Sequence, residues 1–405
     1  MTAQQSAAAP AVSLNITAYA GSLREPPALS GVAYLTGQMI DRGSVGRPAS
    51  AIAGELDDRG VSIRASVTRH TLVLSCTCLS ADFPEILALV SDIVRRPSFP
   101  VEELETRRAE AITLVRQDAD STAVRSIEAS LEMLYGVNHP YARPARGTIA
   151  SLEGLRRDDL RAFHARHVVP SAVRVAIVGD IDAGEALDLA RREFNGWSAL
   201  PTAHDIVEPP PAGGRRTRVI PMPGKSQSDI AYGFTAISRL DPRFYAYWMM
   251  NNIFGQFGLG GRLADNIRER QGMAYYAFST FDGTLGEGPL LVRAGVDPHN
   301  VPRAIEAIDT EVRRLHDQGP TAAEVEETRE SLIGSIPRMF ETNESIAEFL
   351  QTSEQFGLGL DYDRRLGMFL QRVTFEDVRD AAREALDVNR AAVAVAGPHG
   401  PGDRL

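Results

Sequence analysis

The stretch "SLEGLRRDDLRAFHARHVVPSAVRVAIVGD", residues 151–180, predicts a helix, a short break and a buried strand that ends at Gly179. The stretch "LQRVTFEDVRDAAREALDVNRAAVAVAGP", residues 370–398, has the same order of elements, and its strand ends at Gly397. The two glycines are separated by slightly more than half of the chain. A pattern that recurs at such a distance indicates a duplicated module, so this pair decides the architecture that we expect.

Two further pairs of segments support the duplication. Arg107 in one helix with an acidic start matches Arg329 in another, at a slightly larger separation than that of the two glycines. Gly60 matches Gly272 at a slightly smaller one, and such differences in spacing indicate loop insertions. We therefore expect an α+β fold of two similar modules, each a mostly antiparallel sheet packed with helices.

The region between the repeats is rich in proline and glycine and contains three consecutive prolines, Pro209–Pro211. Consecutive prolines neither continue a helix nor fit a central strand. We therefore expect a first module over residues 1–200, a linker over residues 201–217 and a second module over residues 218–405.

The composition is that of an ordinary globular chain. Of 405 residues, 43% are hydrophobic, and the formal net charge is −10 at pH 7. This charge disfavours nucleic acid and anionic membranes, and the apolar runs are shorter than the ~18–20 residues that span a bilayer. We expect neither a nucleic-acid partner nor a membrane span. The start lacks the features of a signal peptide, which favours a cytoplasmic location and leaves a periplasmic one open for a chain without its leader.

The segment "AGSLREPPALSGVAYLTGQMIDRGS", residues 20–44, together with the two modules and the linker, resembles the pitrilysin/insulinase family of zinc metallopeptidases, and within it the mitochondrial processing peptidase. The resemblance covers nearly the whole chain and implies that the modules form half of a clamshell. We expect the strand that precedes this segment in the family to be absent or replaced by the start "MTAQQSAAAPAV". Active members carry H-x-x-E-H on the corresponding helix, where two histidines hold zinc and the glutamate is the general base.

This chain keeps the frame of the zinc motif and lacks its chemistry. The two histidine positions are Tyr34 and Gln38, and the position of the base is Gly37. The third ligand of the family, a glutamate, is expected within residues 111–118, "AITLVRQD", which contain none. Neither Tyr nor Gln replaces a neutral imidazole as a zinc ligand, and Gly has no side chain to accept a proton. We expect no cofactor in this chain and a zinc ion in a partner.

The second module keeps a different part of the family's chemistry. The family signature S-R-L-x-x-x-x-R-E-x-x-G-x-x-Y is matched from Gly261, which stands in place of the serine, to Tyr275. The resemblance implies that Arg268 binds a backbone carbonyl of the substrate and that Tyr275 donates a hydrogen bond to the developing oxyanion. The glycine-rich loop before this helix lets backbone pass close to a substrate, and we expect contacts at Gly258, Gly260 and Gly261.

Spacing alone favours a plainer interpretation, with Arg268 in a surface ion pair and Tyr275 half-buried in a strand. The glycine loop and the repeat favour the functional one. We therefore expect a non-catalytic, substrate-binding subunit of a heterodimeric zinc metallopeptidase. It would complete the active site of an H-x-x-E-H partner, a separate subunit or another module of a longer protein, and would act in peptide hydrolysis only with that partner. The alternative is a catalytically inert scaffold or assembly protein of the same fold.

Overall fold

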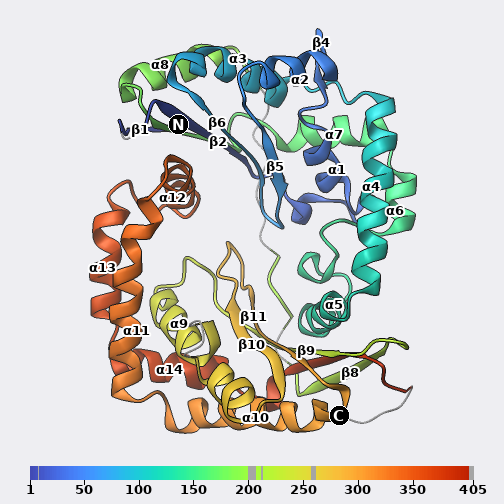
Figure 1. The fold of residues 1–405 in the computed structure, drawn as a ribbon, viewed down its shortest axis with the longest axis vertical. Helices are drawn as coiled ribbons and strands as arrows, with labels where there is room; N and C mark the ends of the chain where they lie inside the picture. The colour runs from blue at the N-terminus through green and yellow to red at the C-terminus, as the bar shows by residue number, and fades with distance from the viewer. Residues whose placement is uncertain (8, 199–206, 211–212, 257–260, 401–405) are drawn as a thin grey trace. The chain divides into compact units, whose positions relative to one another are not determined.

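The computed structural model describes residues 1–7, 9–198, 207–210, 213–256 and 261–400. In this part of the chain the larger strands form two five-stranded sheets, each packed with helices (Figure 1). The expected α+β fold of two similar modules is confirmed.

The first sheet has the order β1-β7-β2-β6-β5. Strand β7 is parallel to β1 and antiparallel to β2, and the remaining pairs are antiparallel. Strand β2 precedes the segment at residue 20, so the expectation that this strand is missing was wrong. The strands are β1 (Thr2–Gln5), β2 (Ala11–Ala18), β5 (Arg64–Val67), β6 (Leu72–Leu79) and β7 (Val173–Gly179), beside a two-stranded ribbon of β3 (Gly43–Ser44) and β4 (Arg47–Pro48).

The second sheet has the order β10-β11-β9-β12-β8, which is the first sheet's arrangement read in reverse. Strand β12 is parallel to β8 and antiparallel to β9, as β7 is to β1 and β2. The final strands of the two repeats therefore hold the same place in their sheets, which confirms the duplication. The strands are β8 (Arg216–Pro221), β9 (Ser228–Thr235), β10 (Ala274–Phe281), β11 (Pro289–Val296) and β12 (Ala392–Gly397).

Helices cover the sheets because one face of each is apolar. In the first sheet Val12, Leu14 and Ile16 of β2 alternate with polar residues and are buried in the larger core of that unit. The helices of the first repeat are α1 (Val32–Met39), α2 (Ala49–Asp57), α3 (Phe83–Arg95), α4 (Val101–Asp120), α5 (Thr122–Tyr135), α6 (Ile149–Gly154), α7 (Arg157–His167) and α8 (Ala183–Glu193). Those of the second are α9 (Phe244–Asn251), the π-helices η5 (Asn252–Gln256) and η6 (Ala264–Arg270), α10 (Val301–Gln318), α11 (Ala322–Ser335), α12 (Asn343–Gln355), α13 (Tyr362–Arg372) and α14 (Phe375–Ala385).

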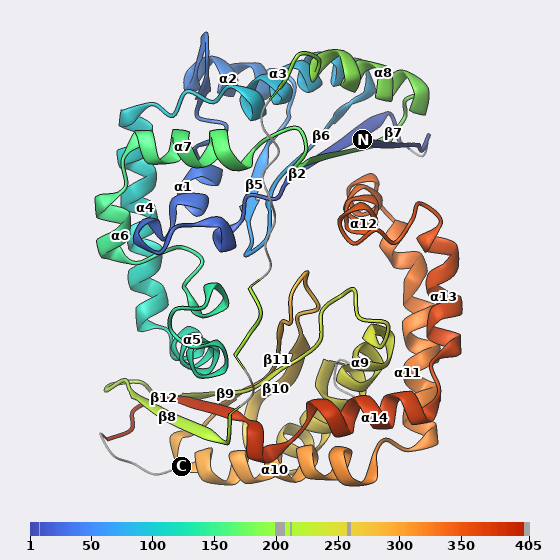
Figure 2. The same cartoon turned by 180° about the vertical axis from the view of Figure 1, so that it is seen from behind.

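The repeats exchange one pair of equivalent helices. Helix α5 packs on β9 and β12 of the second sheet, whereas α12 packs on β2 and β7 of the first (Figures 1 and 2). One compact unit therefore comprises residues 1–115, 144–205 and 337–362, and the other comprises residues 116–143, 206–336 and 363–405. The module boundaries at residues 200 and 218 stay a prediction, and they did not anticipate this exchange.

The predicted linker is only partly visible, because residues 201–206 and 211–212 lie outside the described residues. Residues 207–210 contain neither helix nor strand, and β8 begins at Arg216, inside the predicted range.

The matched pairs of the repeat have structural counterparts, with one correction. Gly60 and Gly272 both adopt a left-handed conformation, φ +64° and +60°, shortly before the equivalent strands β5 and β10. Arg108 donates hydrogen bonds to carbonyls around the end of α6, and Arg329 does so around the end of α13. The counterpart of Arg329 is therefore Arg108, and the predicted match to Arg107 was one residue out.

Candidate functional site

Helix α1 carries the positions of the degenerate zinc motif, and a buried carboxylate fixes its start. Gly31 precedes the helix with φ +93°, a conformation that favours glycine. The Glu25 carboxylate is 4% exposed and accepts hydrogen bonds from the backbone N–H groups of Gly31, at 3.0 Å, and Ala33, at 2.9 Å. A negative charge at a helix N-terminus is stabilising, so α1 is positioned without a metal ion.

Tyr34 and Gln38 lie one helical turn apart and are both half-buried. This is the spacing at which two histidines share a metal ion. Here the guanidinium of Arg146 lies 5.9 Å from the centre of the Tyr34 ring, within the range of a cation–π contact. The helix keeps the geometry of a ligand pair, with side chains that do not suit zinc.

Gly37, at the position of the general base, is buried against strand β5. A Cβ atom added to Gly37 would lie 2.4 Å from Cγ2 of Val67. That is well inside the ~3.5–4.0 Å separation at which carbon atoms are in favourable contact. A glutamate therefore has no room at this position while Val67 stays where it is.

Zinc does not fit the described residues that stand at the positions of the family's ligands. Beyond Tyr34, Gly37 and Gln38, the window for the third ligand lies on α4 and begins at the buried Ala111. Within the described ranges, no group of three or more His, Cys, Asp or Glu side chains is arranged to hold a metal ion.

The Arg/Tyr motif lies in the other unit, on η6 and β10. Arg262 binds the Glu324 carboxylate at the start of α11 through two hydrogen bonds, of 2.6 and 2.7 Å. Asn266 Nδ2 donates to the buried Glu311 carboxylate of α10 at 2.6 Å. These charge-assisted contacts hold η6 against two helices, so the motif has a rigid support.

Gly261, shortly before η6, has a packing role. Gly261 is buried, and a Cβ atom there would lie 2.7 Å from Cα of Gly255. The two backbone segments therefore approach as closely as glycine allows. Gly258 and Gly260 lie outside the described residues. The substrate contacts expected at all three loop glycines, Gly258, Gly260 and Gly261, stay predictions.

Arg268 lies in the last turn of η6, and its side chain is 44% exposed. Its Nε atom is 3.5 Å from the Glu269 carboxylate, which is itself 52% exposed. Exposed ion pairs of this length contribute little free energy, so the guanidinium remains available to another acceptor. Gly272, with φ +60°, then ends the helix and turns the chain into β10.

Tyr275 stands on a β-bulge. In the ladder between β10 and β11, Ala274 pairs with Val296 and Tyr276 pairs with the adjacent Gly295, so Tyr275 has no partner. Bulges of this kind redirect a side chain. Tyr275 is 83% exposed, and the plainer expectation that it is half-buried was wrong.

Its neighbour Tyr276 turns the other way and was missed by the sequence analysis. The Tyr276 hydroxyl donates a hydrogen bond to the carboxylate of Asp229, which is 2% exposed. Thr122 of α5 and Gln227 also donate to Asp229. Burial, followed by the Asp229 carboxylate, raises the pKa of Tyr276. The sequence signal for this network was an acid inside an apolar strand, "SDIAYGF", since such a residue requires partners.

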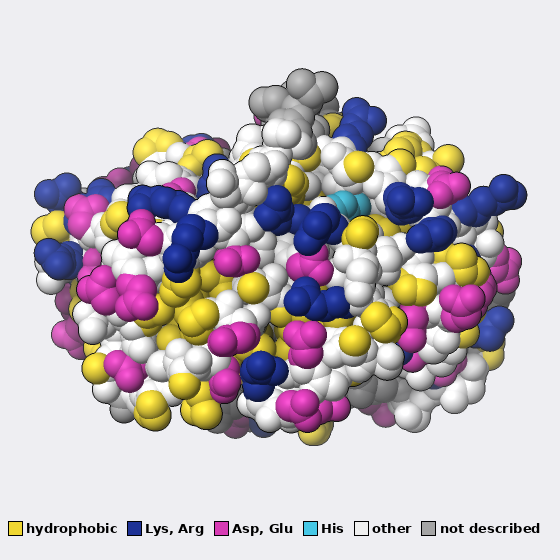
Figure 3. Space-filling model, turned by 90° about the horizontal axis from the view of Figure 1, so that it is seen from above, with side chains coloured by type: hydrophobic (Ala, Val, Ile, Leu, Met, Phe, Trp, Pro, Cys, Tyr) yellow, Lys and Arg dark blue, Asp and Glu magenta, His cyan; other side chains and the backbone are white. Residues whose placement is uncertain are grey.

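On the face of the molecule that Figure 3 draws, positively and negatively charged side chains are mixed. Lys and Arg side chains there alternate with Asp and Glu side chains. Across the part of the chain that the structure describes, no helix is long and apolar enough to cross a membrane.

Two family models match the chain. Residues 1–148 match the model described as insulinase, peptidase family M16. Residues 154–332 match the model described as the peptidase M16 inactive domain. The two matches follow one another along the chain and contain the two sites described above.

Individual relatives agree with the family models. An uncharacterized zinc protease of Streptomyces coelicolor is 26% identical over 392 residues, which are 95% of this chain and 84% of that protein. A non-peptidase homolog of Helicobacter pylori is 22% identical over 385 residues, 93% of this chain and 86% of that protein. The crystal structure of a peptidase M16 inactive domain from Pseudomonas fluorescens superposes with a TM-score of 0.91 at 25% identity, covering 99% of this chain and 96% of that one.

Proposed function

Because this chain belongs to the insulinase family, peptidase family M16, we propose that it is the non-catalytic, substrate-binding subunit of a zinc metallopeptidase. Its partner is a family member, or a module of one, that carries H-x-x-E-H and supplies the zinc ion and the general base. This chain supplies Arg268 and Tyr275 to the partner's active site.

The observation that carries the proposal is the contrast between two adjacent tyrosines. Tyr276 is bonded to a buried carboxylate, whereas the bulge leaves Tyr275 exposed and outside the ladder. Among the described residues, Tyr275 is the most exposed large hydrophobic side chain, at 83%, so its ring contributes little to the packing of the strand. The exposed Arg268, seven residues earlier on a helix anchored by Arg262, supports the same interpretation.

The chemistry assigned to this chain is binding and charge stabilisation. Tyr275 donates its O–H to the oxygen of the scissile carbonyl as that oxygen gains negative charge. One such donor contributes about 10²–10³ in rate, because it binds the transition state more strongly than the substrate. Arg268 presents several N–H donors to a neighbouring backbone carbonyl and so fixes the register of the peptide.

The chain alone does not activate water in this proposal. The motif helix offers Tyr34 and Gln38 in place of imidazoles, and Val67 fills the space beside Gly37. The substrates are extended peptides, which present the backbone carbonyls that Arg268 and Tyr275 require.

The test mixes the purified chain with a candidate H-x-x-E-H family member and follows cleavage of a quenched fluorescent peptide. We expect the mixture to cleave faster than the partner alone, and this chain alone to be inactive and free of stoichiometric zinc. A mixture no faster than the partner alone would support the alternative function, an inert scaffold of the same fold. Zinc bound 1:1 by the isolated chain would contradict the part of the proposal that assigns the zinc ion to the partner.

A further inference from the structure

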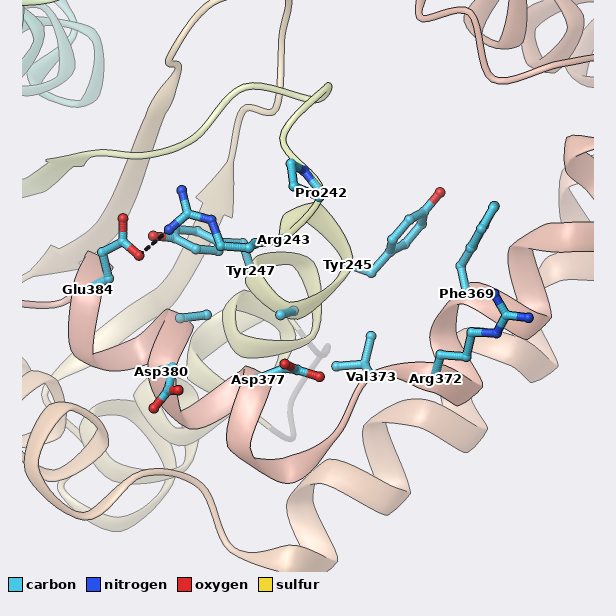
Figure 4. A pocket seen from close by; sticks show the side chains of 12 residues that line it. Pro242, Arg243, Tyr245, Tyr247, Phe369, Arg372, Val373, Asp377, Asp380 and Glu384 are labelled. Carbon is cyan, nitrogen blue, oxygen red and sulfur yellow. Dashed lines mark hydrogen bonds and ion pairs between the residues drawn. The ribbon is translucent and has the colours of Figure 1, made fainter.

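A pocket of about 570 Å³ lies between α9 and the pair α13–α14, within the second unit (Figure 4). Its floor is apolar and its rim is charged. The residues that line it are Pro242, Arg243, Tyr245, Ala246, Tyr247, Phe369, Arg372, Val373, Asp377, Asp380, Ala381 and Glu384.

One end of the pocket is an aromatic shelf. The rings of Tyr245 and Phe369 stack with their centres 5.1 Å apart and their planes at 19° (Figure 4). The guanidinium of Arg365 lies 5.5 Å from the centre of the Phe369 ring, and that of Arg239 lies 5.4 Å from the centre of the Tyr245 ring. These contacts hold the shelf in place, and its side chains offer a preformed surface to an apolar group.

The other wall is a row of carboxylates on α14. Asp377, Asp380 and Glu384 follow one another at intervals of three and four residues, so they share one face of the helix. Each of these carboxylates already has a partner. Asp377 caps its own helix, Asp380 is 3.2 Å from Arg379, and Glu384 binds Arg243. Each carboxylate also keeps acceptor capacity toward the pocket, since an ionised carboxylate offers about four lone-pair sites.

A second pocket, of about 470 Å³, adjoins the first and shares Arg243, Tyr247 and Glu384 with it. The described residues that line the two pockets include six carboxylates and three arginines, and Arg239 and Arg365 lie against the shelf, so a small surplus of negative charge remains. Burial, followed by the carboxylates of Glu208 and Asp241, raises the pKa of Glu287 in the second pocket. The six carboxylates are Glu208, Asp241, Glu287, Asp377, Asp380 and Glu384, and the arginines are Arg243, Arg372 and Arg390.

We infer that the two adjoining pockets, here named the α9–α14 groove, bind a basic peptide segment. An aromatic or large aliphatic side chain of the segment lies on the Tyr245–Phe369 shelf, and a neighbouring Lys or Arg side chain lies among the carboxylates. The shelf supplies the apolar contact area, and the surplus of negative charge selects the cation. Metal ions are not the occupant, because the described residues contain no group arranged to hold one.

The α9–α14 groove is distinct from the Arg268/Tyr275 site. Thr235, which lines its second pocket, is the last residue of β9. The bulge at Tyr275 lies beside the pairing of Val296 with Ser228, the first residue of β9. The two places are at opposite ends of the same sheet, so the inference does not depend on the proposed function.

The experiment is isothermal titration calorimetry of the full chain with three unlabelled probes: acetyl-Arg-Phe-Arg-amide, acetyl-Arg-Ala-Arg-amide and acetyl-Glu-Phe-Glu-amide. We expect the first to bind with a dissociation constant on the order of 10–100 μM and at least about tenfold more tightly than the other two. We also expect weaker binding at high salt, because five of the six carboxylates are exposed. No binding of the first probe up to about 1 mM, or equal binding of all three, would overturn the inference.

Variants locate the binding. Asp380→Asn removes one charge from the groove and should weaken the first probe about threefold. The matched control is Glu376→Gln, an exposed carboxylate on α14 outside the groove, which should leave binding unchanged. Equal weakening by the two would show that only net charge attracts the peptide and would overturn the inference.

Phe369→Ala removes half of the shelf and should weaken binding about tenfold. If Phe369→Ala unfolds the chain, Asp380→Asn and its control still decide the question, because both side chains are exposed. Tyr275→Phe should bind the probe as the native chain does. Loss of binding in Tyr275→Phe would place the peptide at the other end of the sheet and overturn the inference.

Discussion

Cγ2 of Val67 lies 2.4 Å from the place that a Cβ atom on Gly37 would occupy, so β5 fills the space beside this glycine. The loss of the general base is therefore part of the packing of α1 against β5. Restoring the lost residues does not by itself restore the space that they need.

Gly37→Ala should destabilise the protein by about 1–3 kcal/mol, because the added methyl group overpacks the contact with Val67. Chemical denaturation measures the free energy of unfolding. The matched control is Gly54→Ala in α2, where no atom lies within 4 Å of the added Cβ and a gain of about 0.5–1 kcal/mol is expected. Similar effects of the two substitutions would contradict the packing argument. Adding Val67→Ala to Gly37→Ala should recover part of the loss.

The triple variant Tyr34→His, Gly37→Glu and Gln38→His should not bind zinc stoichiometrically, although it restores the H-x-x-E-H pattern. The introduced glutamate would have no room beside Val67, and α4 offers no third ligand in residues 111–118. Metal analysis after dialysis against zinc is the measurement. One zinc ion per chain in the triple variant would contradict this expectation and would show that Val67 of β5 moves to make room for the introduced glutamate.

Tyr275→Phe should lower the turnover of the complex with a zinc-bearing partner by at least about tenfold, because it removes a hydrogen-bond donor to the oxyanion. It should leave the free energy of unfolding nearly unchanged, because the side chain is 83% exposed. The neighbouring Tyr276→Phe is the control with the opposite pattern. It leaves the buried Asp229 one donor short and should cost about 1–3 kcal/mol in stability. Unchanged turnover in Tyr275→Phe would remove that hydroxyl from the mechanism.

Arg262→Lys should loosen the Arg/Tyr segment without unfolding the protein. A lysine cannot reproduce the two parallel hydrogen bonds to Glu324, so η6 loses its anchor to α11. We expect faster amide hydrogen exchange over residues 262–275, measured by mass spectrometry. Arg270→Lys is the matched control, because Arg270 is 72% exposed where Arg262 is 14% exposed. Equal exchange in the two variants would contradict the anchoring role.

The free energy of unfolding should fall as the pH decreases from about 6.5 to about 4. Burial lowers the pKa of His164 from 6.5 to about 4, and its Nε2–H donates to the carbonyl of Val94 at 2.8 Å. Between these two values the unfolded chain binds a proton that the folded chain does not, which costs up to about 3 kcal/mol. The stability is complete above pH 6.5 and is lost as the pH falls through the pKa of the folded state.

His164→Gln tests this dependence, because it keeps an N–H donor and does not titrate. Unfolding curves at several pH values should give a flatter profile for this variant. A slope remains in this variant, because burial also lowers the pKa of His70 to about 4. An unchanged slope in His164→Gln would assign the acid sensitivity to other groups.

The sequence alone determined the features that depend on neighbouring residues. The helix–strand pattern that ends at Gly179 and again at Gly397 predicted two similar α+β modules, and the sheets repeat one topology. The replacement of H-x-x-E-H at Tyr34, Gly37 and Gln38 is also a local fact, because ligand chemistry follows from side-chain type and helical spacing.

Only the tertiary structure decided features that join distant segments. The exchange of α5 and α12 depends on which sheet each amphipathic helix packs against. An amphipathic sequence pattern predicts a helix with one apolar face, but it does not specify the sheet that this face covers. Val67 meets Gly37 from a separate strand, and Asp229 collects donors from Thr122 and Tyr276. Tyr275 and Tyr276 are adjacent and alike in sequence, yet Tyr275 lies unpaired at a bulge and is exposed, whereas Tyr276 is half-buried and donates to Asp229.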